Sequence, residues 1–174
     1  AALRLRKLIL GFVKILAPVP LQTLHANIAR YKTLGNPRAA LRDLIEEGIL
    51  EYVTIDGKFY VWLRQQETAD ELPATVRFLA PFDPVVWDRR RFEHLFGWAY
   101  RFEAYTPVAK RVRGYYAMPM LWLDNIIGWA NATVADGKLH VDVGFVKQRP
   151  RGAEFSRELD REIARLKDFL HILH

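Results

Sequence analysis

An Asp-Gly pair at residues 56 and 57 constrains the fold of this 174-residue chain more than any other feature. The pair favours a tight turn, and it separates two runs rich in β-branched and aromatic residues, 49–55 and 58–63. The sequence therefore predicts an antiparallel β-hairpin at this point, and the neighbouring segments must pack around it.

Three helical segments are predicted before the hairpin, from apolar spacing and from capping residues. The expected elements are helices at 3–16 and 24–32, an extended piece at 21–23, and a third helix that begins at Pro37. Asn36 is suited to cap the third helix and Gly48 to end it. Three helices followed by a hairpin is the order of a winged helix, in which the third helix reads DNA and the hairpin forms the wing.

A polar segment then divides the chain. Residues 64–74, RQQETADELPA, lack aromatic side chains and contain Pro73, which is typical of a linker. We therefore predict a winged-helix domain at 1–64, a linker at 65–75 and a second domain at 76–174.

Short strands and turns alternate in the second domain. Strands are expected at 76–80, 100–105, 115–123, 126–134 and 139–145. Asp83 and Asp88 are placed to cap short helical turns, and an apolar stripe predicts a terminal helix from Phe155 to His174. The expected fold class is α+β, a winged helix followed by a small antiparallel β-barrel or curved sheet with a C-terminal helix.

The charge of the chain favours an anionic partner. Its formal net charge is +6, and eight Lys and Arg residues precede the first acidic residue, Asp43. So long a stretch of one sign points to nucleic acid above all, although a basic protein without a nucleic-acid role has the same composition. No apolar run is long enough to span a membrane and no cysteine is present, so we expect a cytoplasmic protein with no membrane partner.

No residue pattern indicates catalysis, a metal or a cofactor. The five histidines are scattered over different elements, and the single serine, Ser156, lies outside any nucleophile motif. No glycine-rich phosphate loop is present. We therefore predict no catalytic residue, no metal site and no cofactor in this chain.

Basic residues are the candidate DNA-binding groups. Arg38 and Arg42 lie four residues apart on the predicted reading helix, and Lys58 is at the tip of the wing. Denser clusters follow at 89–91 and 110–113, with two tyrosines after them that can stack on bases. The full predicted set is Arg38, Arg42, Lys58, Arg89, Arg90, Arg91, Lys110, Arg111, Arg113, Tyr115 and Tyr116.

Aromatic residues are dense between Leu79 and Arg111, and many have the spacing expected of core residues. Those predicted to be buried are Phe82, Trp87, Phe92, Phe96 and Trp98. Glu103 lies in the same stretch, and its sequence context assigns it no role.

Several fixed spacings in one order resemble a known family. They include the runs Leu79-Ala80-Pro81-Phe82-Asp83, Trp87-Asp88-Arg89, Leu95-Phe96-Gly97, Lys110-Arg111 and Gly114-Tyr115-Tyr116. On these motifs, residues 75–172 resemble the bacterial AlkZ/YcaQ-like winged-helix DNA glycosylases. Residues 1–63 resemble the last winged helix of that family more loosely.

The resemblance implies tandem winged helices and a β-barrel around a DNA channel, and excision of alkylated bases, including those of interstrand crosslinks, without metal or cofactor. It also implies a catalytic Gln-x-Gln motif in the N-terminal part of such proteins. This sequence departs from the family, because Gln65 and Gln66 are adjacent and no Gln-x-Gln occurs. Residues 128–133 also lack the basic side chains that the family places there.

We therefore expect the chain to be the DNA-binding C-terminal part of a monofunctional DNA glycosylase, inactive by itself, or a shortened non-catalytic relative. Its expected partners are double-stranded DNA and N-terminal winged-helix domains of the same protein that are missing from this sequence. The alternatives are a non-catalytic winged-helix DNA-binding protein and a protein-interaction module that docks through its hydrophobic wing.

Overall fold

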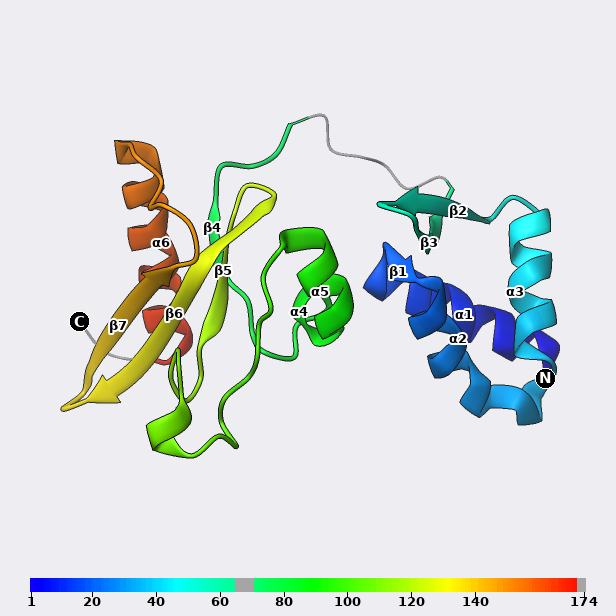
Figure 1. Cartoon of the computed structure of the whole chain (residues 1–174), viewed down its shortest axis with the longest axis horizontal. Coiled ribbons are helices and arrows are strands. Elements are labelled where there is room, and N and C mark those ends of the chain that lie inside the picture. Colours follow the sequence, from blue (N-terminus) through cyan, green and yellow to red (C-terminus); the bar gives the residue numbers. More distant parts are fainter. Residues whose placement is uncertain (65–70, 172–174) are drawn as a thin grey trace. The chain divides into compact units, whose positions relative to one another are not determined.

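The chain folds into two compact units, Ala1–Ala69 and Asp70–His174, in a computed structural model that describes residues 1–64 and 71–171 (Figure 1). They are called unit 1 and unit 2, and each has its own helices, sheet and core. Most of the predicted linker (65–70) and the end of the predicted terminal helix (172–174) lie outside the described residues. No helix within the described part has both the length and the apolar character needed to cross a membrane.

Unit 1 combines helices with a small antiparallel sheet. Its elements are α1 (Ala2–Leu16), β1 (Val19–Pro20), α2 (Leu21–Ile28), η1 (Ala29–Leu34), α3 (Pro37–Glu46), β2 (Leu50–Ile55) and β3 (Lys58–Leu63). The strand order is β1-β3-β2. The predicted hairpin is confirmed, because β2 pairs with β3 from Leu50 opposite Leu63 to Ile55 opposite Lys58, around the left-handed Asp56-Gly57 turn.

The start of α2 differs from the prediction. The extended piece expected at 21–23 is wrong, because these residues form the first turn of α2, and the extended backbone lies at Val19–Pro20 instead. A proline restricts its own φ and disfavours helix in the residue before it, so Pro20 ends the extended stretch and the helix begins directly after it. Val19 pairs with Val61 and thereby adds β1 to the sheet.

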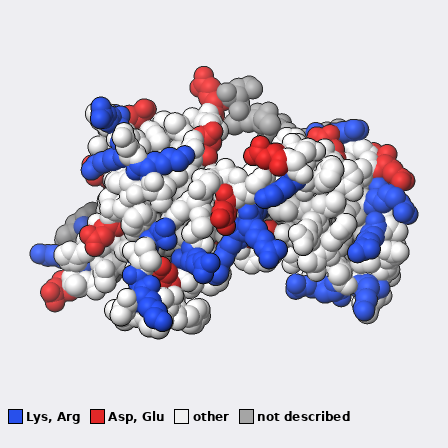
Figure 2. Space-filling view, in the orientation of Figure 1, with Lys and Arg blue, Asp and Glu red and all other residues white. Residues whose placement is uncertain are grey.

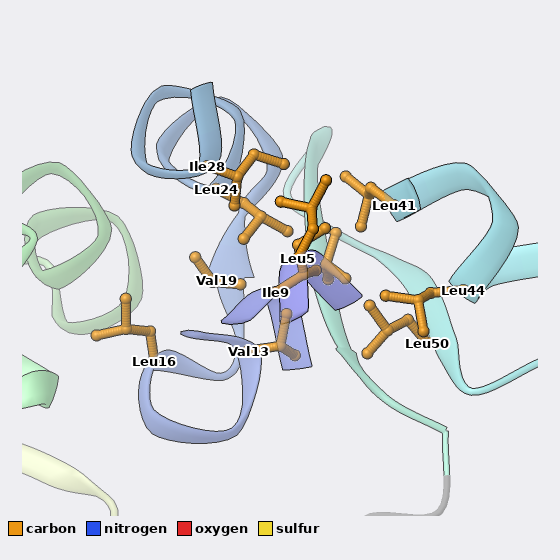
Figure 3. Close-up of a cluster of buried hydrophobic side chains, with 11 residues drawn as sticks. Leu5, Ile9, Val13, Leu16, Val19, Leu24, Ile28, Leu41, Leu44 and Leu50 are labelled. Carbon is orange, nitrogen blue, oxygen red and sulfur yellow. The ribbon is translucent and has the colours of Figure 1, made fainter. Parts of the chain in front are cut away.

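The core of unit 1 is built on one stripe of α1. Leu5, Ile9, Val13 and Leu16 recur at helical spacing and are buried. They pack with buried residues of α2, α3 and β2, which Figure 3 labels as Leu24, Ile28, Leu41, Leu44 and Leu50. This packing fixes α2, α3 and the hairpin relative to one another, and so positions the side chains that they carry at the surface.

Unit 2 is a curled, half-barrel antiparallel sheet with helices. Its elements are β4 (Val76–Phe78), α4 (Pro84–Trp87), α5 (Arg89–Phe96), η2 (Val108–Lys110), β5 (Met118–Trp122), β6 (Asn125–Ala135), β7 (Lys138–Phe145) and α6 (Ala153–Phe169). The strand order is β4-β5-β6-β7 (Figure 1). Asp83 and Asp88 cap α4 and α5 as predicted, since their carboxylates accept hydrogen bonds from backbone N–H groups of the first helical turn.

The sheet of unit 2 has a core on each face. Ile127 packs with Phe155 and Leu159 of α6, whereas its neighbour Ile126 packs with Val86 and Phe92 of α4 and α5. Successive residues of a strand point to opposite faces, so these adjacent isoleucines serve different cores. The terminal helix is therefore a cover for the sheet, and α4 and α5 lie on the other side.

Four of the five strands predicted in unit 2 are confirmed, and the strand at 100–105 is wrong. That stretch is a loop whose backbone pairs with no neighbouring strand. The side chains of this loop contribute to the core instead. Tyr100 is buried against Phe92 and Trp98, and the Tyr100 hydroxyl donates a hydrogen bond to the carbonyl of Ala117. Burial raises the pKa of the Tyr100 phenol.

Candidate nucleic-acid interface

Unit 1 has a surface hollow of about 530 Å³ where the start of α2, the start of α3 and the tip of the hairpin meet. Arg38 of α3 and Lys58 of β3 line it, together with Gln22 and His25 of α2 and Phe59. The structure thus brings together two predicted DNA-binding residues that are distant in sequence. No carboxylate is among the residues that line this hollow, so it favours an anion.

His25 and Gln22 are not singled out by the sequence, because no local pattern places the start of α2 beside the hairpin tip. His25 is half-buried, and burial together with the charge of Arg38 lowers the pKa of its imidazole. A negatively charged group in the hollow would oppose this effect and favour the protonated ring.

Two acidic residues at the C-terminal end of α3 form ion pairs with arginines. Glu46 forms an ion pair with Arg42 at 3.7 Å, with both side chains exposed, and Glu47 pairs with Arg6 at 2.5 Å. The hydrogen bond from Arg6 lowers the pKa of the Glu47 carboxyl. Arg38, at the other end of the helix, makes no ion pair within the described part of the chain, so its charge remains available to a ligand.

Glu103 holds the basic segment of unit 2 in place. Its carboxylate is 6% exposed and accepts from three consecutive backbone N–H groups, those of Val112, Arg113 and Gly114, at 2.8–3.2 Å. Burial alone would raise the pKa of Glu103, but these hydrogen bonds and the charge of Arg113 outweigh it and lower the pKa. The segment that carries Lys110, Arg111 and Arg113 is therefore anchored rather than loose.

Arg113 is stacked against two indole rings. Its Cζ lies 4.9 Å from the ring centroid of Trp98 and 5.6 Å from that of Trp129. Its backbone carbonyl also accepts a hydrogen bond from the Asn131 side chain. Arg111 has a different setting, since its Cζ lies 5.1 Å from the Tyr115 ring centroid and its Nε donates to the Thr106 carbonyl at 2.8 Å.

The other predicted contacts of unit 2 differ in exposure. Arg89, Arg90 and Lys110 are exposed, as are Tyr115 and Tyr116. Arg91 is only 4% exposed, and its guanidinium donates to the backbone carbonyls of Pro84 and Val85. The three adjacent arginines therefore differ in environment. Two are at the surface, and the third connects α5 to the preceding turn through hydrogen bonds.

The aromatic predictions are partly wrong. Phe92 and Trp98 are buried as predicted, and Phe96 is partly buried, but Phe82 is 68% and Trp87 44% exposed. The helix that carries Trp87, α4, has only four residues, and only Val86 of them is buried. Phe82 touches the Phe102 ring edge-on, with centroids 5.5 Å apart, and leaves most of its own surface in solvent.

Charged residues of both signs are scattered over the face of each unit shown in Figure 2. Location therefore distinguishes the cations better than number does. Arg38 makes no ion pair within the described residues, and Arg113 lies on two indole rings while the nearby Glu103 carboxylate is bonded to backbone N–H groups. Among the described residues, no group of three or more His, Asp or Glu side chains could hold a metal ion.

One protein family matches nearly the whole chain. The family model described as "DNA glycosylase AlkZ-like" matches residues 1–169, which span unit 1 and all of unit 2 except its last five residues. No solved structure matches the chain.

Proposed function

Because this chain belongs to the AlkZ-like DNA glycosylase family, we propose that it is a DNA-binding part of a repair glycosylase that acts on alkylated or crosslinked bases. The family match over residues 1–169 carries the proposal. Membership of a DNA glycosylase family implies a DNA ligand, and the basic hollow of unit 1 and the anchored basic segment of unit 2 have the chemistry to bind its backbone.

Unit 1 acts as a winged helix in this proposal. The start of α3 approaches the duplex, the β2–β3 hairpin is the wing, and Arg38 and Lys58 bind backbone phosphates from the hollow between them. Arg42 adds a weaker contact, because it must exchange its pairing with Glu46 for a phosphate. The two residues that line the same hollow, Gln22 and His25, are further donors to the same backbone.

Unit 2 binds DNA through exposed and half-buried cations in this proposal. Arg89 and Arg90 extend from α5, and Lys110 and Arg111 from the segment anchored by Glu103. Tyr115 and Tyr116 offer ring faces to bases, with Tyr116 supported edge-on by Phe102 at 5.3 Å. Arg91 acts indirectly, because its hydrogen bonds to the carbonyls before α5 hold that helix in position.

The chemical step lies outside this chain in our proposal. The sequence contains no Gln-x-Gln, and the adjacent Gln65 and Gln66 lie outside the described residues. We expect the chain to bind duplex DNA without releasing a base. Release of N7-alkylated guanine by the chain alone would show that the catalytic residues are within it.

Paired charge removals test the role of the unit 1 hollow. We expect the double variant Arg38→Ala/Lys58→Ala to weaken duplex binding and to reduce the salt slope by about 2, one unit for each lost phosphate contact. The matched control is Lys7→Ala/Lys14→Ala, which removes two exposed charges of the same unit that do not line the hollow. Fluorescence anisotropy with a labelled duplex measures both. Equal losses in the two variants would refute a localised site.

The alternative is a DNA-binding regulator or a protein-interaction module. The exposed aromatic side chains of the hairpin, Tyr52 and Phe59, favour the interaction module, since they pack edge-on at 6.4 Å and form a small apolar patch. Charge reversal at Arg38 and Lys58 distinguishes DNA binding from protein interaction, because it weakens DNA binding and leaves binding through an apolar patch intact.

A further inference from the structure

Unit 2 contains a second hollow, and Arg113 is the one residue of its lining that belongs to the predicted DNA contacts. It has a volume of about 380 Å³, in the range of small-ligand sites, and Trp98, Arg113, Trp129, Phe145 and Lys147 are among its lining residues. Both charged side chains of the lining are cations, and no carboxylate is present. The hollow is therefore suited to an anion with an apolar attachment.

The two tryptophans form a fixed wall of this hollow. Trp129 on β6 is paired with Gly144 on β7, where a Cβ would lie only 2.2 Å from Cζ2 of the indole. Because residue 144 has no side chain, the Trp129 ring can lie across β7. Trp98 is 6% exposed, and its ring centroid is 6.4 Å from that of Trp129, with the planes inclined by 32°.

Arg113 is held against this wall at three points. Its N–H donates to Glu103 at 2.8 Å, its carbonyl accepts from Asn131, and its guanidinium lies on both indoles. A side chain that is already ordered loses little entropy when a ligand binds, and a stacked guanidinium keeps its edge free for hydrogen bonds. Arg113 is thus a prepared ligand-binding group.

The wall also has unused hydrogen-bond donors. Nε1 of Trp98 and Nε of Arg113 are buried, and neither has an acceptor among the described residues. A buried donor without an acceptor is unfavourable by about 1–3 kcal/mol, so such groups are uncommon unless a ligand or water provides an acceptor. Anionic oxygen atoms are the acceptors that this combination of two donors and two cations selects.

We propose that this hollow binds one phosphate group, with Arg113 and Lys147 as its cationic ligands and the indole N–H of Trp98 as a further donor. The identification of the anion as phosphate rests on the proposed DNA-binding function. A phosphodiester of the DNA backbone and a terminal phosphate at a strand end share this chemistry, and the experiment distinguishes the two sources.

Nuclear magnetic resonance of the indole N–H groups tests the site directly. The chain has five tryptophans, and the Trp98→Phe variant assigns the relevant signal. Titration with inorganic phosphate, against chloride at matched ionic strength, is expected to shift the Trp98 indole signal in a saturable manner. A shift that is linear, or the same as with chloride, overturns the proposal.

Replacement of Lys147 tests the site, and replacement of a lysine at the other end of β7 is the matched control. Lys147→Ala removes an exposed ligand that follows β7 and leaves the stacked rings intact, and we expect it to raise the phosphate Kd about tenfold. Lys138→Ala removes an exposed charge at the other end of β7 and is expected to leave Kd unchanged. The same Kd in the wild type and Lys147→Ala overturns the assignment.

Duplexes with and without a 5′-phosphate identify the source. Tighter binding of the phosphorylated duplex, lost in Lys147→Ala, identifies a strand end, and equal binding that is weakened by the same substitution identifies the backbone. If Lys147→Ala changes the affinity for neither duplex, the proposed phosphate site is refuted, although DNA binding by the chain stands. If phosphate shifts the Trp98 signal but no duplex binds, the hollow binds phosphate and the proposed function fails.

Discussion

Glu103 shows how one buried carboxylate organises a surface of opposite charge. It donates no hydrogen bond and forms no side-chain ion pair within the described residues, and it accepts from the backbone of the segment that carries Arg111 and Arg113. This arrangement leaves the guanidinium groups available to a ligand, because main-chain N–H groups donate to the Glu103 carboxylate in their place. The residue is therefore a positioning group for the basic segment.

Replacement of Glu103 by Gln tests that role through stability and its pH dependence. The folded pKa of Glu103 is lowered, so its carboxylate stabilises the fold above the unfolded pKa of about 4.3, and this contribution is lost as the pH falls through that value toward the lower folded pKa. We expect Glu103→Gln to reduce the free energy of unfolding by about 1–3 kcal/mol at neutral pH. The difference from the wild type should shrink in acid.

Urea unfolding at neutral and acidic pH measures both effects. The control is Glu93→Gln, which replaces an exposed glutamate of α5 and is expected to change stability little. A Glu103→Gln variant as stable as the wild type at neutral pH, or a difference that grows in acid, would contradict the anchoring role.

At the scale of elements, the close approach of β6 and β7 depends on two glycines. A Cβ at Gly128 would lie 1.9 Å from the carbonyl oxygen of Gly144, and a Cβ at Gly144 would meet the Trp129 ring. The first of these contacts is with backbone, which cannot rotate away. The curvature of the sheet at this point, and the seating of Trp129, therefore need a residue without a side chain.

A pair of Gly→Ala substitutions separates this close contact from a general effect of glycine. We expect Gly128→Ala to destabilise unit 2 by about 3 kcal/mol, the upper part of the range for overpacking. Gly11→Ala is expected to stabilise unit 1 by about 0.5–1 kcal/mol, because no atom lies within 4 Å of its added Cβ and alanine favours the helix α1. Calorimetry of the two variants measures these changes. A Gly128→Ala variant with wild-type stability would show that the strands can separate freely.

Elements with local signals could be predicted from the sequence. The Asp56-Gly57 and Asp136-Gly137 turns have left-handed backbone that few other residue pairs adopt, and Asn36 caps α3 through its own neighbours in the chain. The predicted strand at 100–105 is wrong because this stretch contributes side chains and no backbone pairing. Tyr100 is buried in the core that contains Phe92 and Ile126, and Glu103 accepts hydrogen bonds from the following loop. An alternating hydrophobic pattern in the sequence does not show which elements the side chains pack against.

The candidate site was less accessible to prediction, because its partners are distant in sequence. Glu103 reaches amides nine to eleven residues away. Trp98, Arg113 and Trp129 meet from three segments, and the adjacent Arg90 and Arg91 have opposite environments although their sequence context is the same. Sequence identifies which residues are basic, and only the fold shows which of them are at the surface.

At the scale of the whole molecule, each unit contributes its own cations to the proposed binding of DNA. Unit 1 offers the hollow lined by Arg38 and Lys58, and unit 2 offers its anchored basic segment and the exposed arginines of α5. The net charge of +6 adds a long-range attraction that is sensitive to salt. Phosphate neutralisation by these side chains is the central claim, and its thermodynamic signature is counterion release.

The most direct measurement is duplex binding by the chain over a series of salt concentrations, from about 50 to 200 mM, followed by anisotropy. Roughly four to six phosphate contacts predict that log K falls against log salt with a slope of about −4 to −5, a loss of affinity of several hundredfold over that range. Binding that is absent at the lowest salt, or that does not change across the series, would contradict the claim that these cations grip a nucleic-acid backbone.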